Sequence, residues 1–131
     1  MHKFQMYLII MYICLMYSKE LLKGTLKTII LKLLSESDSM YGYQITQKVK
    51  EITEGKIVLT EGALYPALHK LEADGLLTTE KQTVGNRVRK YYSLTQTGNS
   101  SAKEKVEELK EFMEALKAII NITPQTLAWS I

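Results

Sequence analysis

Residues 62–77 read GALYPALHKLEADGLL, and the prediction of the fold starts from them. Its apolar side chains recur at steps of three and four residues, which predicts an amphipathic helix over residues 60–73. Thr60 suits the N-cap of that helix, and Gly75 suits its end because glycine readily adopts the left-handed conformation. Pro66 removes a backbone donor, so we expect the turn before it to be irregular or kinked. The inward stripe consists of Leu64, Ala67, Leu68 and Leu71.

Two more helices are predicted on the N-terminal side of this stretch. Apolar residues recur with helical spacing over residues 21–34, where Ser18 suits the N-cap, and again over residues 41–53. The polar cluster 35–39 separates the two helices, because short polar side chains compete for backbone hydrogen bonds. Gly55 fits the end of the second helix.

On the C-terminal side, two strand-like runs cover residues 76–83 and 87–94. Their β-branched and aromatic residues suit a pleated surface, and the turn-forming residues 84–86 between the runs predict a β-hairpin. Three cations gather on the second strand, at Arg87, Arg89 and Lys90. Cations placed so closely together predict a clamp for phosphate groups.

A long helix is predicted next, from Ser100 to Asn121, because Pro124 prevents easy continuation. Its apolar residues alternate at steps of four and three, which is a heptad seam. The seam is either a packing face within the subunit or a dimer contact. The preceding domain is small and a long helix needs partners for its whole stripe, so we expect a dimer. The seam comprises Ala102, Val106, Leu109, Met113, Leu116 and Ile120, widened by Phe112 and Ile119.

Three helices, a hairpin and a further helix form the order of a winged helix-turn-helix domain with an appended dimerisation helix. The expected fold class is mainly α with a small β-hairpin, that is, α+β. In such domains the third helix enters the major groove of DNA, and the hairpin wing lies on the backbone or minor groove. The candidate DNA-binding residues are Thr60, Glu61, Gly62, Tyr65, Pro66, His69, Lys70, Arg87, Arg89 and Lys90.

Several motifs in this order resemble the PadR family of bacterial transcription regulators. They are YGYQI at residues 41–45, GALYPALHKLE at 62–72, GLL at 75–77 and GNRVRKYYSLT at 85–95, followed by Gly98. Each motif alone is weak, but their combination is specific, and the similarity extends in register over residues 21–120.

The resemblance implies a homodimeric winged-helix repressor that binds a palindromic operator. It also implies dimerisation through the last helix packed with the first, and release from DNA by a small hydrophobic or phenolic effector. Drug-binding relatives carry a tryptophan on the dimerisation helix where this chain has Leu109, and the only tryptophan here is Trp129. The expected dimer interface comprises Leu22, Leu26, Val106, Leu109, Phe112, Met113, Leu116 and Ile120.

Composition limits the other classes of function. The chain has 131 residues, 46% of them hydrophobic and 24% charged, with a net charge of +3, as expected for one globular domain. It has no glycine-rich phosphate loop, no nucleophile beside a base and no metal-ligand spacing, so we expect neither an enzyme nor a cofactor or metal. The single Cys14 favours a reducing compartment, the cytoplasm. The alternative is a winged-helix protein-interaction module without DNA binding.

The N-terminus differs from the rest of the chain, because residues 6–17 are almost wholly apolar. We expect residues 1–17 to be an extension outside the domain, with Met16 as an alternative start. A packing or membrane-surface role and a signal or anchor are the other interpretations, although the run is short for a membrane helix and no stable membrane association is expected. The domain would then cover residues 18–98, the dimerisation helix 99–121 and a tail 122–131.

Overall fold

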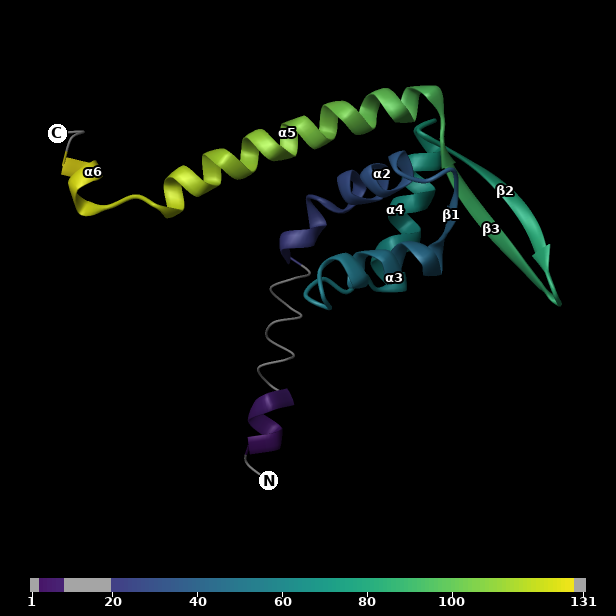
Figure 1. Ribbon diagram of the computed structural model, residues 1–131, viewed down its shortest axis with the longest axis horizontal. Coiled ribbons are helices and arrows are strands. Elements are labelled where there is room, and N and C mark those ends of the chain that lie inside the picture. The colour runs from purple at the N-terminus through teal and green to yellow at the C-terminus, as the bar shows by residue number, and fades with distance from the viewer. Residues whose placement is uncertain (1–2, 9–19, 129–131) are drawn as a thin grey trace.

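The computed structural model describes residues 3–8 and 20–128 of the chain. Four longer helices and a small sheet build the domain (Figure 1). In chain order the elements are α2 (Leu26–Ser35), β1 (Met40–Tyr41), α3 (Gly42–Ile52), α4 (Glu61–Ala73), β2 (Leu77–Val84), β3 (Arg87–Leu94), α5 (Gln96–Ile120) and α6 (Pro124–Ala128).

The first predicted helix is interrupted in the structure. Residues 20–23 are helical, but Gly24 and Thr25 form a turn, and α2 begins only at Leu26. Glycine is a poor helix former, and the Thr25 hydroxyl donates to the Leu22 carbonyl at 3.3 Å, which competes with helix propagation. The predicted cap at Ser18 lies outside the described residues.

The second and third predicted helices, α3 and α4, are confirmed almost to the residue. The Thr60 hydroxyl caps α4 by accepting the Ala63 N–H at 3.3 Å. After α4, Gly75 adopts a φ of +78°, and the Leu76 N–H reaches the Leu71 carbonyl at 2.9 Å, as in a glycine-terminated helix. Helix α4 continues without interruption through Pro66, so the turn before this proline is helical and not irregular.

The sheet has three strands in the order β1-β3-β2, all antiparallel. The predicted hairpin is confirmed, with Val84 paired to Arg87 across a two-residue turn. Gly85 has a φ of +63° there, as the first central position of a type II′ turn requires. The short strand β1, which the sequence did not predict, pairs Met40 with Tyr92.

One hydrophobic core joins the helices to the base of the hairpin. Helix α2 lies at the centre of this core, with Ile30 and Leu31 fully buried. Strand β3 contributes the buried ring of Tyr92. The remaining buried apolar residues are Leu26, Leu34, Met40, Ile45, Val49, Leu59, Leu64, Leu68, Leu71, Leu77 and Ala102.

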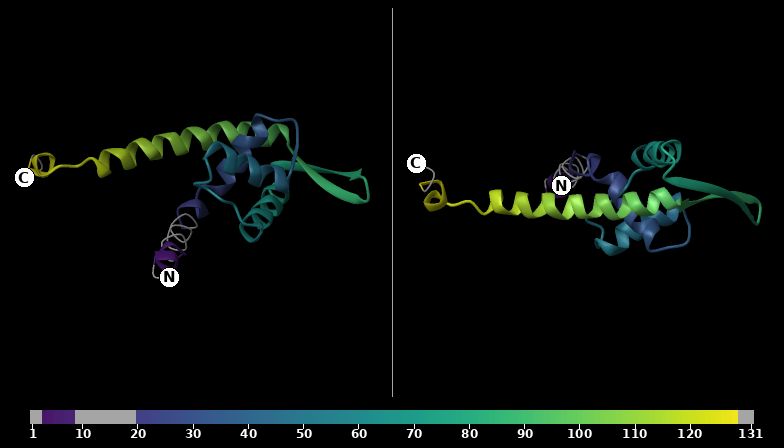
Figure 2. Two further views of the ribbon diagram at one scale, coloured as in Figure 1. Left: turned by 60° about the horizontal axis from the view of Figure 1, so that its bottom comes forward. Right: turned by 90° about the horizontal axis from the view of Figure 1, so that it is seen from above.

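The long helix α5 packs along α2 and then extends beyond the domain (Figure 1), while the β2–β3 hairpin projects from the other end (Figure 2). Helix α5 begins at Gln96, four residues before the predicted start. The Thr95 hydroxyl caps α5 by accepting a hydrogen bond from the Gly98 N–H at 3.0 Å. The expected tail contains the short helix α6, which begins at Pro124, a favourable first helical position.

Of the expected N-terminal extension, the structure describes residues 3–8, which are helical. Phe4, Met6, Tyr7 and Leu8 are all exposed there. Within the described ranges, no helix is both long enough and apolar enough to span a membrane.

Candidate nucleic-acid interface

Helix α4 has one buried face and one open face. Leu64, Leu68 and Leu71 point into the core and are essentially inaccessible. The seven helix residues proposed for DNA contact from the sequence all lie on the accessible side: Thr60, Glu61, Gly62, Tyr65, Pro66, His69 and Lys70. The structure therefore brings this set together on a single surface.

Gly62 lies at an open position of that surface. A Cβ built at Gly62 would have no neighbour within 4 Å, so nothing in the subunit itself requires glycine at this position. The absence of a side chain leaves the backbone of the first turn of α4 accessible to another molecule.

Tyr65 has a second role that the sequence did not predict. A Cβ placed on Gly42 would lie 2.6 Å from the Tyr65 hydroxyl oxygen, so this ring lies directly over the first residue of α3. Gly42 itself is buried. Tyr65 thus links α3 to α4 while keeping part of its ring exposed, and a hydroxyl in this position sits between the two helices of the helix-turn-helix.

The cations of the proposed interface differ in their surroundings. Lys70 pairs with Asp74 on its own helix, Nζ to Oδ1 at 3.0 Å, with both side chains exposed. Exposed pairs of this kind contribute at most about 1 kcal/mol, so Lys70 can exchange its partner for a phosphate. Arg87 is exposed at the hairpin turn, and among the described residues it has neither an ion pair nor an aromatic partner.

Arg89 and Lys90 lie on opposite faces of β3, because side chains alternate along a strand. The Arg89 guanidinium carbon lies 4.6 Å from the centroid of the Tyr41 ring, and that ring meets Tyr91 edge-on at 5.4 Å between centroids. This cation–π contact restrains Arg89 against the neighbouring strand β1. The three cations therefore do not form one compact clamp on a single face.

Lys90 faces the core side of the sheet. Its ammonium lies 3.7 Å from Glu72 Oε2 on α4 and 5.4 Å from the centroid of the Tyr92 ring. Burial raises the pKa of the Tyr92 phenol, and the charge of the Lys90 ammonium acts in the opposite direction.

The DNA-binding candidates chosen from the sequence omit Lys81 and Tyr41, although Tyr41 belongs to the YGYQI motif. Lys81 on β2 lies directly opposite Lys90 on β3 in the strand register, and its side chain is exposed. It therefore adds a cation to the face of the hairpin that carries Lys90. The only signal for it was its position on the predicted strand, opposite the cation-rich strand. The apolar pattern places Tyr41 at the start of the second predicted helix, whereas in the structure Tyr41 lies on strand β1, beside Arg89.

The expected dimer residues divide into two groups. Leu26 is only 8% exposed and packs in the core of its own subunit, and Leu22 packs against that core. The distal half of α5, in contrast, presents an uncovered apolar stripe, with Phe112 58% and Ile120 77% exposed. Met113 and Leu116 belong to the same exposed stripe, whereas Val106 and Leu109 are partly buried at its beginning.

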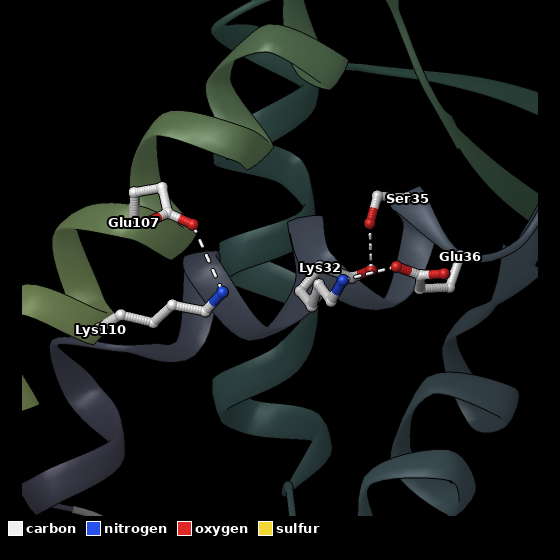
Figure 3. A network of polar contacts seen from close by, with 5 residues as sticks. All are labelled: Lys32, Ser35, Glu36, Glu107 and Lys110. Carbon is white, nitrogen blue, oxygen red and sulfur yellow. Dashed lines mark hydrogen bonds and ion pairs between the residues drawn. The ribbon is translucent and has the colours of Figure 1, made fainter.

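An apolar groove of about 330 Å³ continues this stripe toward the domain. Side chains of α2, the end of α3, the loop after α3 and α5 line it, including Ile29, Leu33, Ile57, Val106, Leu109 and Met113. Lys32 and Lys110 stand at its edge. Lys32 pairs with Glu36 at the C-cap of α2, and Lys110 pairs with Glu107 on α5 (Figure 3). Neither ion pair joins the two helices, so apolar contact holds α2 to α5.

No cluster of histidine, cysteine or acidic side chains able to hold a metal ion occurs within residues 3–8 and 20–128.

Comparison with known proteins agrees with this arrangement. The transcriptional regulator PadR-like family matches residues 30–104. The transcriptional regulator YqjI of Escherichia coli (strain K12) is 30% identical over 95 residues, which cover 72% of this chain. This chain spans only 44% of the length of YqjI.

Two solved structures share the fold. A transcriptional regulator from Clostridium thermocellum superposes with a TM-score of 0.72 at 29% identity, over 78% of this chain and 99% of the other. A PadR family transcription regulator from Clostridium difficile R20291 gives 0.64 at 27% identity, over 75% of this chain and all of the other. These relatives are named as regulators and not as enzymes. Because the family match covers more than half of the sequence and the fold agrees, this chain belongs to the PadR-like family of transcriptional regulators.

Proposed function

We propose that this protein is a sequence-specific, DNA-binding transcriptional repressor that acts as a homodimer on a palindromic operator. The observation that carries the proposal is the exposed face of α4, with its open position at Gly62, next to a projecting basic hairpin. An α-helix fits the major groove of B-DNA, and an adjacent hairpin then reaches the backbone or the minor groove.

In this arrangement α4 reads base edges while cations fix the position of the protein. His69 and Lys70 lie on the open face of α4, and Arg87 lies at the hairpin turn. Contacts to phosphate give affinity and register but no sequence information, so specificity would come from the first turns of α4. The backbone at Gly62 allows that part of the helix to approach the bases closely.

The exposed stripe of α5 supports the homodimer. Burying a side chain such as Phe112 or Met113 contributes about 1.5–3 kcal/mol, and a single subunit leaves both of them in water. Two copies of α5 that pack through this stripe would also cover the groove between α2 and α5. A two-fold dimer presents two copies of α4, which is why we propose a palindromic operator.

We further propose that a small hydrophobic or phenolic effector releases the repressor from DNA. The apolar groove between α2, α3 and α5 supports this, because it lies where the DNA-binding helices meet the proposed dimer helix. A molecule bound there would change the angle between the two copies of α4, and with it the fit to the operator.

Substituting Gly62 tests the DNA-binding role. Gly62→Leu is expected to leave the subunit folded, because the added side chain meets open space and the residue does not need a positive φ. The same side chain would hold α4 away from the bases and reduce specific affinity by roughly 100-fold or more, toward non-specific binding. Fluorescence anisotropy with an operator duplex measures the affinity, and thermal melting checks the fold.

The matched control is Gly62→Ala, whose small side chain should leave operator affinity within a few-fold and raise stability by about 0.5–1 kcal/mol. If Gly62→Leu bound the operator as tightly as the parent, α4 would not lie in the groove. The operator would then be read by another part of the chain. A parent protein that enriches no DNA sequence would favour the protein-interaction module instead.

A further inference from the structure

The ion pair between Lys90 and Glu72 joins the β2–β3 hairpin to helix α4. Lys90 lies on β3 and Glu72 on α4, with 3.7 Å between Nζ and Oε2. Each side chain is about one-third exposed, yet the Oε2 atom itself is buried and has no hydrogen-bond partner. A buried carboxylate oxygen without a hydrogen bond is costly unless a positive charge stands close to it.

Lys90 is held in place from a second direction. Its ammonium lies 5.4 Å from the centroid of the Tyr92 ring, and Tyr92 is one of the fully buried residues of the core. The Lys90 side chain therefore points toward the C-terminal end of α4, where Glu72 lies. Arg87, three residues earlier, is exposed at the hairpin turn.

We propose that Lys90 is a positioning residue, which sets the wing relative to α4 through Glu72, and not a phosphate contact. This inference rests on the proposed DNA-binding function and revises the role that the sequence suggested for Lys90. On the same face of the hairpin, the exposed Lys81 remains free to meet the DNA backbone.

The geometry of the hairpin explains why such a restraint matters. Strand β1 is only two residues long and covers β3 only at Tyr91 and Tyr92, so the outer part of the hairpin has two strands. Two-stranded hairpins are marginally stable on their own. Lys90 sits at the point where the third strand ends, and a link from there to α4 fixes the direction of the projecting part.

The test is a double-mutant cycle of Lys90→Met and Glu72→Gln in the 131-residue chain, with operator affinity measured over a range of salt concentrations. Methionine keeps most of the apolar stem of lysine, and glutamine keeps the shape of glutamate. We expect each single variant to lose about five-fold in affinity, and the double variant to lose no more than either one. The slope of log affinity against log salt should stay at the parent value for all three.

Arg87→Ala is the matched control for a phosphate contact and should reduce that slope by about 0.9 per subunit. If Lys90→Met reduced the slope like Arg87→Ala, and Glu72→Gln left affinity unchanged or raised it, Lys90 would be a phosphate contact and the proposal would be wrong.

Thermal melting gives a readout that does not depend on DNA. Lys90→Met should lower the melting temperature, because it leaves Glu72 without its cation, and Glu72→Gln in the same chain should restore part of the loss. Equal melting of Lys90→Met and the parent would contradict the pairing. A parent protein that binds no DNA would instead overturn the proposed function and leave the melting result to decide on the ion pair.

Discussion

Replacing Gly98 with alanine is expected to destabilise the whole domain. A Cβ on Gly98 would lie 2.0 Å from the carbonyl oxygen of Leu76 and 3.0 Å from its carbonyl carbon. Both are backbone atoms at the junction of α4 and β2, where no side chain can rotate away to make room. The Leu76 carbonyl is also fixed by the Thr95 N–H, which it accepts at 3.0 Å.

The clash affects three elements at once. The Thr95 hydroxyl caps α5 at the Gly98 N–H and also donates to the Gly75 carbonyl at 2.7 Å, so the start of α5 is tied to the end of α4. We expect Gly98→Ala to reduce the free energy of unfolding by about 3 kcal/mol or more, at the upper end for overpacking.

Urea denaturation followed by circular dichroism measures this loss. Gly62→Ala is the matched control, because it places the same methyl group on a helical glycine with open space around it. A Gly98→Ala variant as stable as the parent would show that α5 does not pack on Leu76 in this way.

A second large effect is expected from charges in the α5 stripe. Met113→Lys combined with Leu116→Glu places two charges in the proposed dimer contact, where an unpaired buried charge costs about 3–5 kcal/mol. Both side chains are exposed in the single subunit, so the domain itself should stay folded. We expect the dimer dissociation constant to rise by more than about 100-fold.

Sedimentation velocity ultracentrifugation distinguishes the outcomes. The parent should sediment as a dimer and the double variant as a folded monomer. Glu111→Lys with Glu114→Lys serves as the control, because these exposed residues lie on the opposite side of α5 and should leave the dimer intact. If the Met113 and Leu116 variant kept its dimeric mass, the stripe would not be the interface.

Local signals explain which elements could be predicted from the sequence. Helices α3 and α4 and the hairpin have a clear hydrophobic period and residues such as Thr60, Gly75 and Gly85 at their ends, and these act over a few neighbouring residues. Strand β1 has only two residues, and its pairing with Tyr92 arises from residues far apart in the chain. No periodicity exists in so short a segment.

The boundaries of α2 and α5 were missed for different reasons. The apolar period runs unbroken through Gly24 and Thr25, so it does not reveal the turn there. At α5, the first turn is polar apart from Gly98, which reads as a helix breaker in the sequence. In the structure its missing side chain allows the close approach to Leu76.

In the candidate site too, features with a local sequence signal could be predicted, and contacts between distant parts of the chain could not. The open face of α4 follows directly from its apolar stripe, because residues outside the stripe must face outward. The partners of Arg89 and Lys90 lie on β1 and α4, at a distance along the chain that no local pattern records. Similarly, the heptad seam predicts the apolar stripe of α5. Only the packed structure shows that Leu26, an expected dimer residue on α2, is buried in the core of its own subunit.

Selection of bound sequences from a random library of DNA duplexes, with the 131-residue chain at physiological salt, is the most direct test of the proposed function. Two copies of α4 related by a two-fold axis should enrich an inverted repeat whose half-site centres lie one helical turn, about 10 base pairs, or a multiple of it apart. Enrichment of such a repeat by the parent, and its loss with Gly62→Leu, is the expected result. An unenriched pool, or a single motif without two-fold symmetry, would contradict a homodimeric repressor that reads DNA with α4.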